Sequence, residues 1–406
     1  MTSSRQDQLI ALIQDQIRPA VGCTEPGAAA YAAAVAAQTL GETPERLTVS
    51  VSRNILKNAM GVGIPGTDMV GLPIAVALGA LCGDAGAGLA VLHNITDEDV
   101  AQAQKLYIDV LAEAGEHSAR TVIAGTHTNI IRIEKDGQCI STGDGAEESG
   151  AAGAGAELSL KEIDDFVRSV SSEKLNFLRE CIDMNSAISQ EGLEHPYGLG
   201  IGQSIYETLP ENNSEENYAL AVTCAAADAR MGGCTLPVMS SCGSGNQGLT
   251  ATLPVIAVAR KRGLSEEDTF RALAYSLLVT IHVKQHLGKL SALCACSVGA
   301  SIGTACALTY LDGGTLQQIG HCVDNVVADV SGVICDGAKA GCALKIATGV
   351  SSAFRGAMLA MKNRNASALD GIVGRDPEAS VDNLGNLCNT GMLDTDRVIL
   401  DMLVCK

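Results

Sequence analysis

The chain has 406 residues, 47% of them hydrophobic, which is enough to bury a large core in two or more domains. Its formal net charge of −18 argues against binding nucleic acid or an anionic membrane, because both partners require a basic surface. The longest apolar stretches are shorter than the roughly 20 residues that a membrane-spanning helix needs. We therefore expect no nucleic acid and no membrane as partners, and a small molecule as the ligand.

The composition also bears on the compartment and on the type of core. The first 15 residues are polar and amphipathic, without the apolar segment of a secretory signal. The 15 cysteines are therefore expected to be free thiols of a cytoplasmic protein. Aromatic residues are scarce, whereas alanine and glycine are abundant, so we predict closely packed helices with small side chains between them.

The first part of the chain mixes two periodicities. Apolar spacing predicts helices over residues 8–17, 28–40 and 97–113, while alternation predicts strands over residues 47–51 and 128–134. This pattern is typical of an α/β domain.

A Gly/Ala/Glu-rich stretch over residues 143–155 has no periodicity and is interpreted as a linker. Ser159 and Glu162 then predict a helix start with a capping box. Beyond this point the pattern is almost wholly helical, and from about residue 218 it indicates a bundle. We predict an α+β fold, with an N-terminal α/β domain over 1–158 and a mainly helical catalytic domain over 159–406.

Three short segments carry cysteines in apolar surroundings, at residues 22–26, 291–296 and 332–337. The Cys-x-Cys spacing of Cys294 and Cys296 is one residue too short for a zinc ribbon. A three-thiolate site assembled from distant segments suits an iron–sulfur cluster better, and three ligands on four irons leave one iron open as a Lewis acid. If these segments share a site, the active site lies at the domain interface.

The individual cysteines differ in their settings. Cys23 precedes a helix whose dipole is expected to lower the thiol pKa, and Cys335 follows a helix. Cys294 and Cys296, if helical, point about 200° apart, so one of them faces the cluster, and we choose Cys294. Cys234, Cys242 and Cys296 remain alternatives for the third ligand. The other cysteines have the ordinary contexts of buried thiols: Cys82, Cys139, Cys181, Cys224, Cys306, Cys322, Cys342, Cys388 and Cys405.

Residues 240–248 form a second polar segment, in which closely spaced glycines allow backbone N–H groups to converge on a carboxylate. Ser244, Asn246 and Gln247 add hydrogen-bonding groups. The segment lacks a P-loop lysine, and without a preceding strand it is not a dinucleotide motif; the plain alternative is a tight turn between helices. Upstream, Arg230 could bind a carboxylate or form a buried pair with Asp228.

Polar residues also gather at two places in the first half. Asn54, Lys57 and Asn58 precede a glycine-rich stretch, and His127 and Asn129 open a predicted strand. Lys57 or His127 could remove a proton from a substrate carbon, and the three asparagines could bind the substrate. A further pair, His282 and His286, has helical spacing but lacks the glutamate of a His-Glu-x-x-His zinc site, so we assign it to packing.

Taken together, these motifs resemble one family along nearly the whole chain. The segments that carry the resemblance are 22–26, 54–58, 62–73, 125–130, 185–193, 228–248, 291–294 and 331–337. They resemble the L-cysteine desulfidase family, which is related to the iron–sulfur L-serine dehydratases. The resemblance implies a [4Fe–4S] cluster held by Cys23, Cys294 and Cys335, breakdown of L-cysteine to pyruvate, ammonia and sulfide, and no pyridoxal phosphate.

Several alternatives stay open. An iron that accepts a thiolate also accepts a hydroxyl, so L-serine or another β-substituted amino acid is a close alternative substrate. A non-catalytic iron–sulfur sensor or amino-acid-binding protein would use four protein ligands instead of three. A pyridoxal enzyme could catalyse the same elimination, although no residue pattern supports it. We expect a homodimer.

Overall fold

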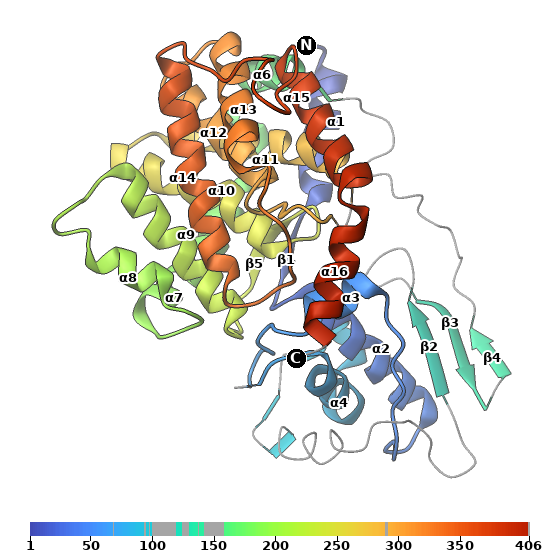
Figure 1. The fold of residues 1–406 in the computed structure, drawn as a ribbon. Helices are drawn as coiled ribbons and strands as arrows, with labels where there is room; N and C mark the ends of the chain where they lie inside the picture. Colours follow the sequence, from blue (N-terminus) through green and yellow to red (C-terminus); the bar gives the residue numbers. More distant parts are fainter. Residues whose placement is uncertain are drawn as a thin grey trace.

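The computed structural model describes residues 1–67, 69–92, 95–96, 98–99, 119–123, 130–136, 138–141, 158–288 and 291–404. The predicted α+β class is confirmed, because helices dominate and the strands are few and short (Figure 1). The N-terminal elements are α1 Ser3–Gln16, β1 Ile17–Ala20, α2 Thr24–Leu40, α3 Arg53–Ala59, α4 Leu72–Cys82, η1 Ala85–Ala90, β2 Ala119–Ile123, β3 Ile130–Lys135 and β4 Gln138–Ser141. The remaining elements are α6 Leu160–Ser169, η2 Ser172–Leu175, α7 Leu178–Glu194, α8 Ile201–Glu207, α9 Glu215–Met231, β5 Val238–Ser241, α10 Gly245–Arg262, α11 Glu266–Leu287, α12 Gly299–Leu311, α13 Leu316–Val330, α14 Cys342–Met361, α15 Pro377–Asn386, η3 Leu387–Gly391 and α16 Leu393–Val404.

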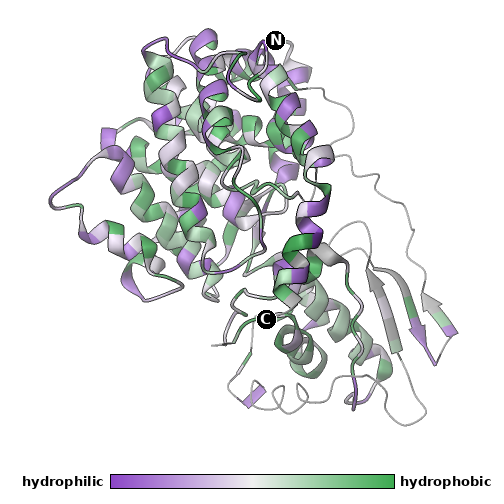
Figure 2. Cartoon of the chain, viewed as in Figure 1, coloured by the Kyte–Doolittle hydropathy of each residue, from purple (hydrophilic) through white to green (hydrophobic). Residues whose placement is uncertain are grey.

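The large helical body is built around α11, which packs against α10 and α12. Most of its inward side chains are Ala, Val, Leu and Ile, and the fully buried Tyr275 is the largest side chain of this core. Apolar residues accordingly concentrate on these helices, whereas polar residues lie toward the peripheral loops (Figure 2). Among the described residues, none of the helices combines the length and apolar composition that crossing a membrane requires.

The smaller N-terminal part packs α2 against α4, with the antiparallel sheet β2-β3-β4 beside α2. The predicted helices at 8–17 and 28–40 are confirmed as α1 and α2, and the described part of the predicted strand at 128–134 is confirmed as β3. The predicted strand at 47–51 is wrong: Leu47 and Val51 pack on the apolar cluster between α2 and α4, and the segment forms no ladder with the described strands. Apart from residues 98 and 99, the predicted helix at 97–113 lies outside the described residues, as does the predicted linker at 143–155.

Both ends of the chain contact the opposite half. Strand β1 pairs antiparallel with β5, and α16 runs down to α3 (Figure 1). The N-cap of α6 forms as predicted, since Ser159 Oγ accepts from Glu162 N at 3.2 Å. The other half of the capping box does not form, because the Glu162 carboxylate binds Arg5 of α1 at 2.6 and 2.8 Å. The domain boundary at 158/159 remains a prediction.

Asn185→Ala should destabilise the body by about 2–4 kcal/mol, because the fully buried amide satisfies both backbone groups of Met239 in β5. Its Nδ2 also donates to Thr252 Oγ1 at 2.9 Å. Denaturant unfolding measures the loss. Asn383→Ala, which removes one exposed hydrogen bond to Ile372 O, is the control and should cost less than about 1 kcal/mol; equal losses would contradict the assignment.

Candidate functional site

The polar segment at 240–248 forms a strand, a sharp turn and a helix. Strand β5 ends at Ser241, Cys242 and Gly243 adopt left-handed backbone conformations with φ of 49° and 77°, and α10 begins at Gly245. Ser244 caps α10 by accepting from Gln247 N. The expectation that no strand precedes this segment is therefore wrong, because β5 forms only by pairing with β1, far away in the sequence. We call residues 241–247 the elbow.

Arg230 joins the elbow to the loop before Cys23. Its guanidinium is 4% exposed, and its two terminal nitrogens donate to Asn246 Oδ1 at 3.1 Å and to Gly22 O at 2.6 Å. The remaining Nε has no hydrogen-bond partner among the residues that the structure describes. Asp228 instead accepts from the backbone N–H groups of Leu199 and Gly202, so the alternative of an Asp228–Arg230 pair is wrong.

Cys23 occupies the N-cap position of α2, where its thiol lies beside a buried carboxylate instead of capping the helix. Glu25 accepts from the Cys23 thiol at 2.9 Å, from Thr24 Oγ1 at 3.0 Å and from Asn58 Nδ2 at 2.8 Å. Burial and the charge of Glu25 raise the pKa of the Cys23 thiol well above its usual value. The expectation that the helix dipole lowers this pKa is wrong, because desolvation and a neighbouring carboxylate outweigh the dipole. Glu25 lies in the Gly-Cys-Thr-Glu-Pro motif, but sequence analysis gave it no role.

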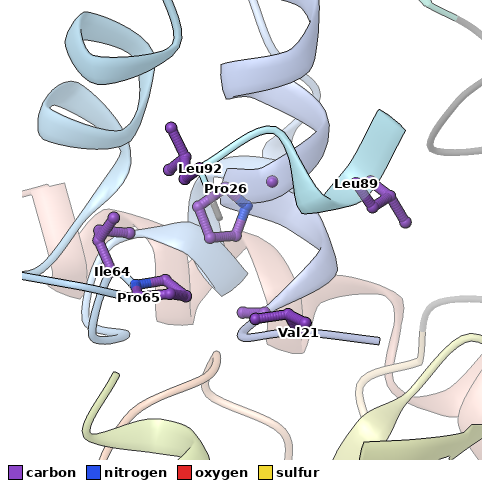
Figure 3. Close-up of a pocket in the computed structure, with 8 residues that line it drawn as sticks. Val21, Pro26, Ile64, Pro65, Leu89 and Leu92 are labelled. Carbon is purple, nitrogen blue, oxygen red and sulfur yellow. The ribbon is translucent and has the colours of Figure 1, made fainter. Parts of the chain in front are cut away.

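A small apolar pocket adjoins the Cys23 thiol. Figure 3 shows the side chains around this pocket, which come from the start of α2, from the loop before α4 and from the region of η1. Its lining residues are Val21, Cys23, Pro26, Gly27, Ile64, Pro65, Leu89 and Leu92. On this side, Cys23 therefore faces apolar residues, whose side chains neither donate nor accept hydrogen bonds.

The other two cysteine segments lie side by side. Leu293 and Ile334 form an antiparallel bridge, in which Cys294 N donates to Val333 O and Cys335 N donates to Ala292 O. Cys294 lies in a turn before α12, and its Sγ is 3.4 Å from that of Cys296. The argument from helical spacing is therefore wrong, since both thiols face each other.

Cys342, at the start of α14, links these thiols to Cys23. Burial, with smaller contributions from Cys294 and Cys335, raises the pKa of the Cys342 thiol to about 11, and this residue shares a small buried cluster with Cys23, Val62 and Met231. The structure thus brings the segments of Cys294 and Cys335 together, and Cys23 shares its buried cluster with Cys342. In the described parts of the chain, no three His, Cys, Asp or Glu side chains already surround a common metal position. The donors are nevertheless of the kind that iron–sulfur clusters use, because all of them are thiols.

Four lysines border this group of thiols. Lys57 is 3% exposed and its Nζ lies 2.6 Å from Asp396 Oδ1 of α16. Lys339 and Lys345 both bind Asp336, next to Cys335. Lys284 of α11 is buried close to four thiols, and this burial lowers its pKa. Sequence analysis missed Lys284, although a lysine in the last turn of a long apolar helix is itself a signal.

The other predicted residues fall into three groups. His127 and Asn129 lie outside the described residues; Asn54 lies in α3, with its side chain outside the description. The side chains of Asn58, Ser244 and Asn246 form the bonds already described. Gln247 is fully buried, and within the described part of the chain its amide has no hydrogen-bond partner other than the neighbouring Cys242 thiol.

The histidine pair connects α11 to α15, as the assignment to packing predicts. His282 Nε2 lies 2.8 Å from Glu378 Oε2, and His286 Nε2 lies 3.2 Å from Asp382 Oδ1.

In iron-free protein, Cys294 should titrate near neutrality. The Cys296 S–H donates to the Cys294 thiolate and thereby lowers the Cys294 pKa to about 7. Cys296→Ala removes the donor, so the Cys294 pKa should rise toward the usual thiol value. Thiolate ultraviolet absorbance against pH measures this in each variant, with Cys181→Ala as the buried-thiol control; an unchanged titration in Cys296→Ala would contradict the assignment.

Comparison with known proteins extends over the whole chain. A family described as serine dehydratase alpha chain matches residues 86–401, which include Cys294 and Cys335 but not Cys23. A UPF0597 protein of Bacteroides fragilis (strain YCH46) is 43% identical and covers 100% of both chains. UPF0597 proteins of Bacteroides thetaiotaomicron and Aeromonas hydrophila are each 42% identical, covering 100% and 98% of this chain and 99% and 96% of their own.

Proposed function

Because the chain belongs to the serine dehydratase alpha chain family, whose members are lyase-type enzymes, we propose that it is an iron–sulfur-dependent L-cysteine desulfidase. In this proposal it converts L-cysteine to pyruvate, ammonia and hydrogen sulfide. The observation that supports the proposal is the antiparallel bridge between Leu293 and Ile334, the residues that precede Cys294 and Cys335. The further proposals are a cytoplasmic homodimer and no pyridoxal phosphate.

Cys23, Cys294 and Cys335 are proposed to hold a [4Fe–4S] cluster. With three protein ligands, the cluster supplies an open iron, a Lewis acid for the sulfur that leaves. Cys23 is bound to Glu25, so its proton has an acceptor two residues away when the thiol becomes a ligand. Burial and the neighbouring Cys294 raise the pKa of the Cys335 thiol, and the positive charges of Lys57 and Lys345 offset part of this rise.

The remaining chemistry is assigned to side chains of the chain. Elimination requires removal of the Cα proton, for which Lys57 and His127 are the candidate bases. Lys57 is held by Asp396, so it acts as a base only after giving up a proton. Ser244, Asn246 and Gln247 at the elbow, positioned by Arg230, are proposed to bind the carboxylate, and Asn54, Asn58 and Asn129 the amino group. Loss of the Cα proton and the sulfur gives aminoacrylate, which hydrolyses to pyruvate and ammonia.

L-serine dehydration is the second candidate, favoured by the description of the matching family. The same proton removal would then release water instead of sulfide. The apolar pocket beside Cys23 favours cysteine, because a thiol leaves water more readily than a hydroxyl does.

The test is anaerobic purification, followed by iron and sulfide analysis and by pyruvate assays with L-cysteine and L-serine. About four irons per chain and sulfide release from cysteine are expected. Cys23→Ala, Cys294→Ala and Cys335→Ala should each lose iron, whereas Cys181→Ala, a buried thiol of α7, should keep it. Preference for serine would move the protein to the dehydratases. Bound iron with neither turnover nor a change of the spectrum on addition of substrate would indicate an iron–sulfur sensor. Absence of iron would refute the cluster.

A further inference from the structure

Cys296 is a thiol beside a proposed cluster ligand, and the three-cysteine cluster does not use it. Its Sγ lies 3.4 Å from the Sγ of Cys294; Cys296 is partly exposed, whereas Cys294 is 3% exposed. The sulfurs of a disulfide are about 2.05 Å apart, so these two need to approach each other by a distance on the order of 1 Å. The pair is therefore close to the geometry of a disulfide.

The backbone of the turn holds the two thiols in this arrangement. Cys294 N donates to Val333 O at 2.9 Å, and Cys294 O accepts from Ser297 N at 3.0 Å and from Val298 N at 2.8 Å. Ser297 Oγ in turn donates to Lys345 O of α14. Because the turn is bonded on both sides, little conformational freedom remains to be lost when a covalent bond joins the thiols. Each thiol is thus a fixed neighbour with a high effective concentration for the other.

A second thiol pair shows why exposure matters. Cys322 Sγ donates to Cys306 Sγ at 3.7 Å, between α13 and α12, but both side chains are 0% exposed. Thiol–disulfide exchange requires access to the attacking sulfur, so an oxidant cannot reach that pair without opening the core. Of these two pairs, Cys294 and Cys296 combine proximity with access.

We propose that Cys294 and Cys296 are the site of a reversible disulfide, which forms when no cluster is bound and a small-molecule disulfide is present. One protein thiol exchanges with the small disulfide RSSR, which gives a mixed disulfide and releases RSH. The neighbouring thiol then attacks the protein sulfur of the mixed disulfide, and a second RSH leaves. The protein loses two electrons and two protons, and RSSR takes them up as two RSH.

The consequence of this bond for the enzyme rests on the proposed function. Iron binds the thiolate, so Cys294 cannot serve as a ligand while its sulfur is bonded to Cys296. Such a short ring gains little from loop-closure entropy, and a strained or exposed disulfide is readily reduced. The bond therefore protects the ligand from irreversible oxidation and delays cluster assembly until small thiols reduce it.

Peptide mass spectrometry on the full-length, iron-free protein tests the disulfide. Protein freed of iron with a chelator is incubated with glutathione disulfide and then denatured and treated with a maleimide. Cys294 and Cys296 should be joined and carry neither maleimide nor glutathione, while Cys306 and Cys322 should carry maleimide. Cys296→Ala should leave Cys294 without an internal partner, whereas Cys322→Ala, the matched control in the buried pair, should keep the bond.

Two further measurements test reversibility and the connection to the cluster. Excess reduced glutathione should lower the disulfide-bonded fraction at least about fivefold. Anaerobically purified holoprotein should resist glutathione disulfide to a similar extent, because iron occupies the Cys294 sulfur. Absence of the bond in iron-free wild type, equal oxidation of Cys306 and Cys322, or a bond that glutathione does not reduce would overturn the inference. A bond that forms equally with iron bound would support the disulfide and refute Cys294 as a cluster ligand.

Discussion

Gly337→Ala should abolish iron binding and pyruvate release. Gly337 has φ of 94°, a left-handed conformation that costs an L-residue about 1–2 kcal/mol. A Cβ atom there would lie 3.0 Å from the Lys57 carbonyl carbon and closer still to its oxygen. Backbone atoms cannot rotate away as a side chain does, so the loop that carries Cys335 must move away from α3. We expect a total cost of at least about 3 kcal/mol.

The measurements for Gly337→Ala are iron per chain after anaerobic purification, pyruvate release and thermal unfolding. Gly332→Ala is the matched control, since it lies on the same connection between α13 and α14 but has ordinary φ and no atom within 4 Å of the added Cβ. The control should keep wild-type iron and melting temperature. Wild-type iron content in Gly337→Ala would show that the contact with Lys57 does not fix the position of Cys335.

Arg230→Met should have the second largest effect. Removal of the buried guanidinium leaves Gly22 O and Asn246 Oδ1 without their donors, and hydrogen bonds to charged groups are worth about 1.5–3 kcal/mol each. We therefore expect a loss of about 3–5 kcal/mol in unfolding free energy. Because the same bonds connect the Cys23 loop to the elbow, the KM for L-cysteine should also rise, by about tenfold or more.

Denaturant unfolding and steady-state kinetics on the anaerobic enzyme measure the two effects of Arg230→Met. Arg230→Lys keeps the charge but reaches one acceptor at a time, so it should be intermediate. Arg355→Met is the control, because it removes an exposed arginine paired with Asp329 and should cost less than about 1 kcal/mol. A rise in KM without any loss of stability would show that Arg230 binds substrate directly instead of positioning the elbow.

Local patterns predicted the helices well, and long-range contacts explain most of the errors. Apolar periodicity and Ser159 located α1, α2 and the start of α6, because those signals are contained within a few residues. Strand β5 was not expected, since its hydrogen-bonding partner β1 lies at the other end of the chain. The strand predicted at 47–51 is wrong because the alternating apolar residues of this segment pack on α2 and α4 and not within a sheet.

The same distinction holds at the site. The motifs identified Cys294 and Cys335, but the turn that brings Cys296 against Cys294 could not be inferred from spacing alone. The high pKa of Cys23 depends on burial and on the side-chain orientation of Glu25, neither of which the sequence specifies. Lys284 was missed because its significance comes from thiols on four other segments.

The contacts between the ends of the chain and segments far away in the sequence have a consequence for biosynthesis. Arg18 of β1 accepts a hydrogen bond from Ser240, 222 residues later, and Lys57 pairs with Asp396, 339 residues later. The ribosome synthesises the chain from its N-terminus onward. The contacts of α1 and β1 can therefore form only after the helical body has been synthesised, and the contact of α3 only after α16 has been. Contacts of such high sequence separation form slowly. The pair of Lys57 and Asp396 therefore forms only after α16 has been synthesised, and a chain interrupted before α16 would leave Lys57 without its aspartate.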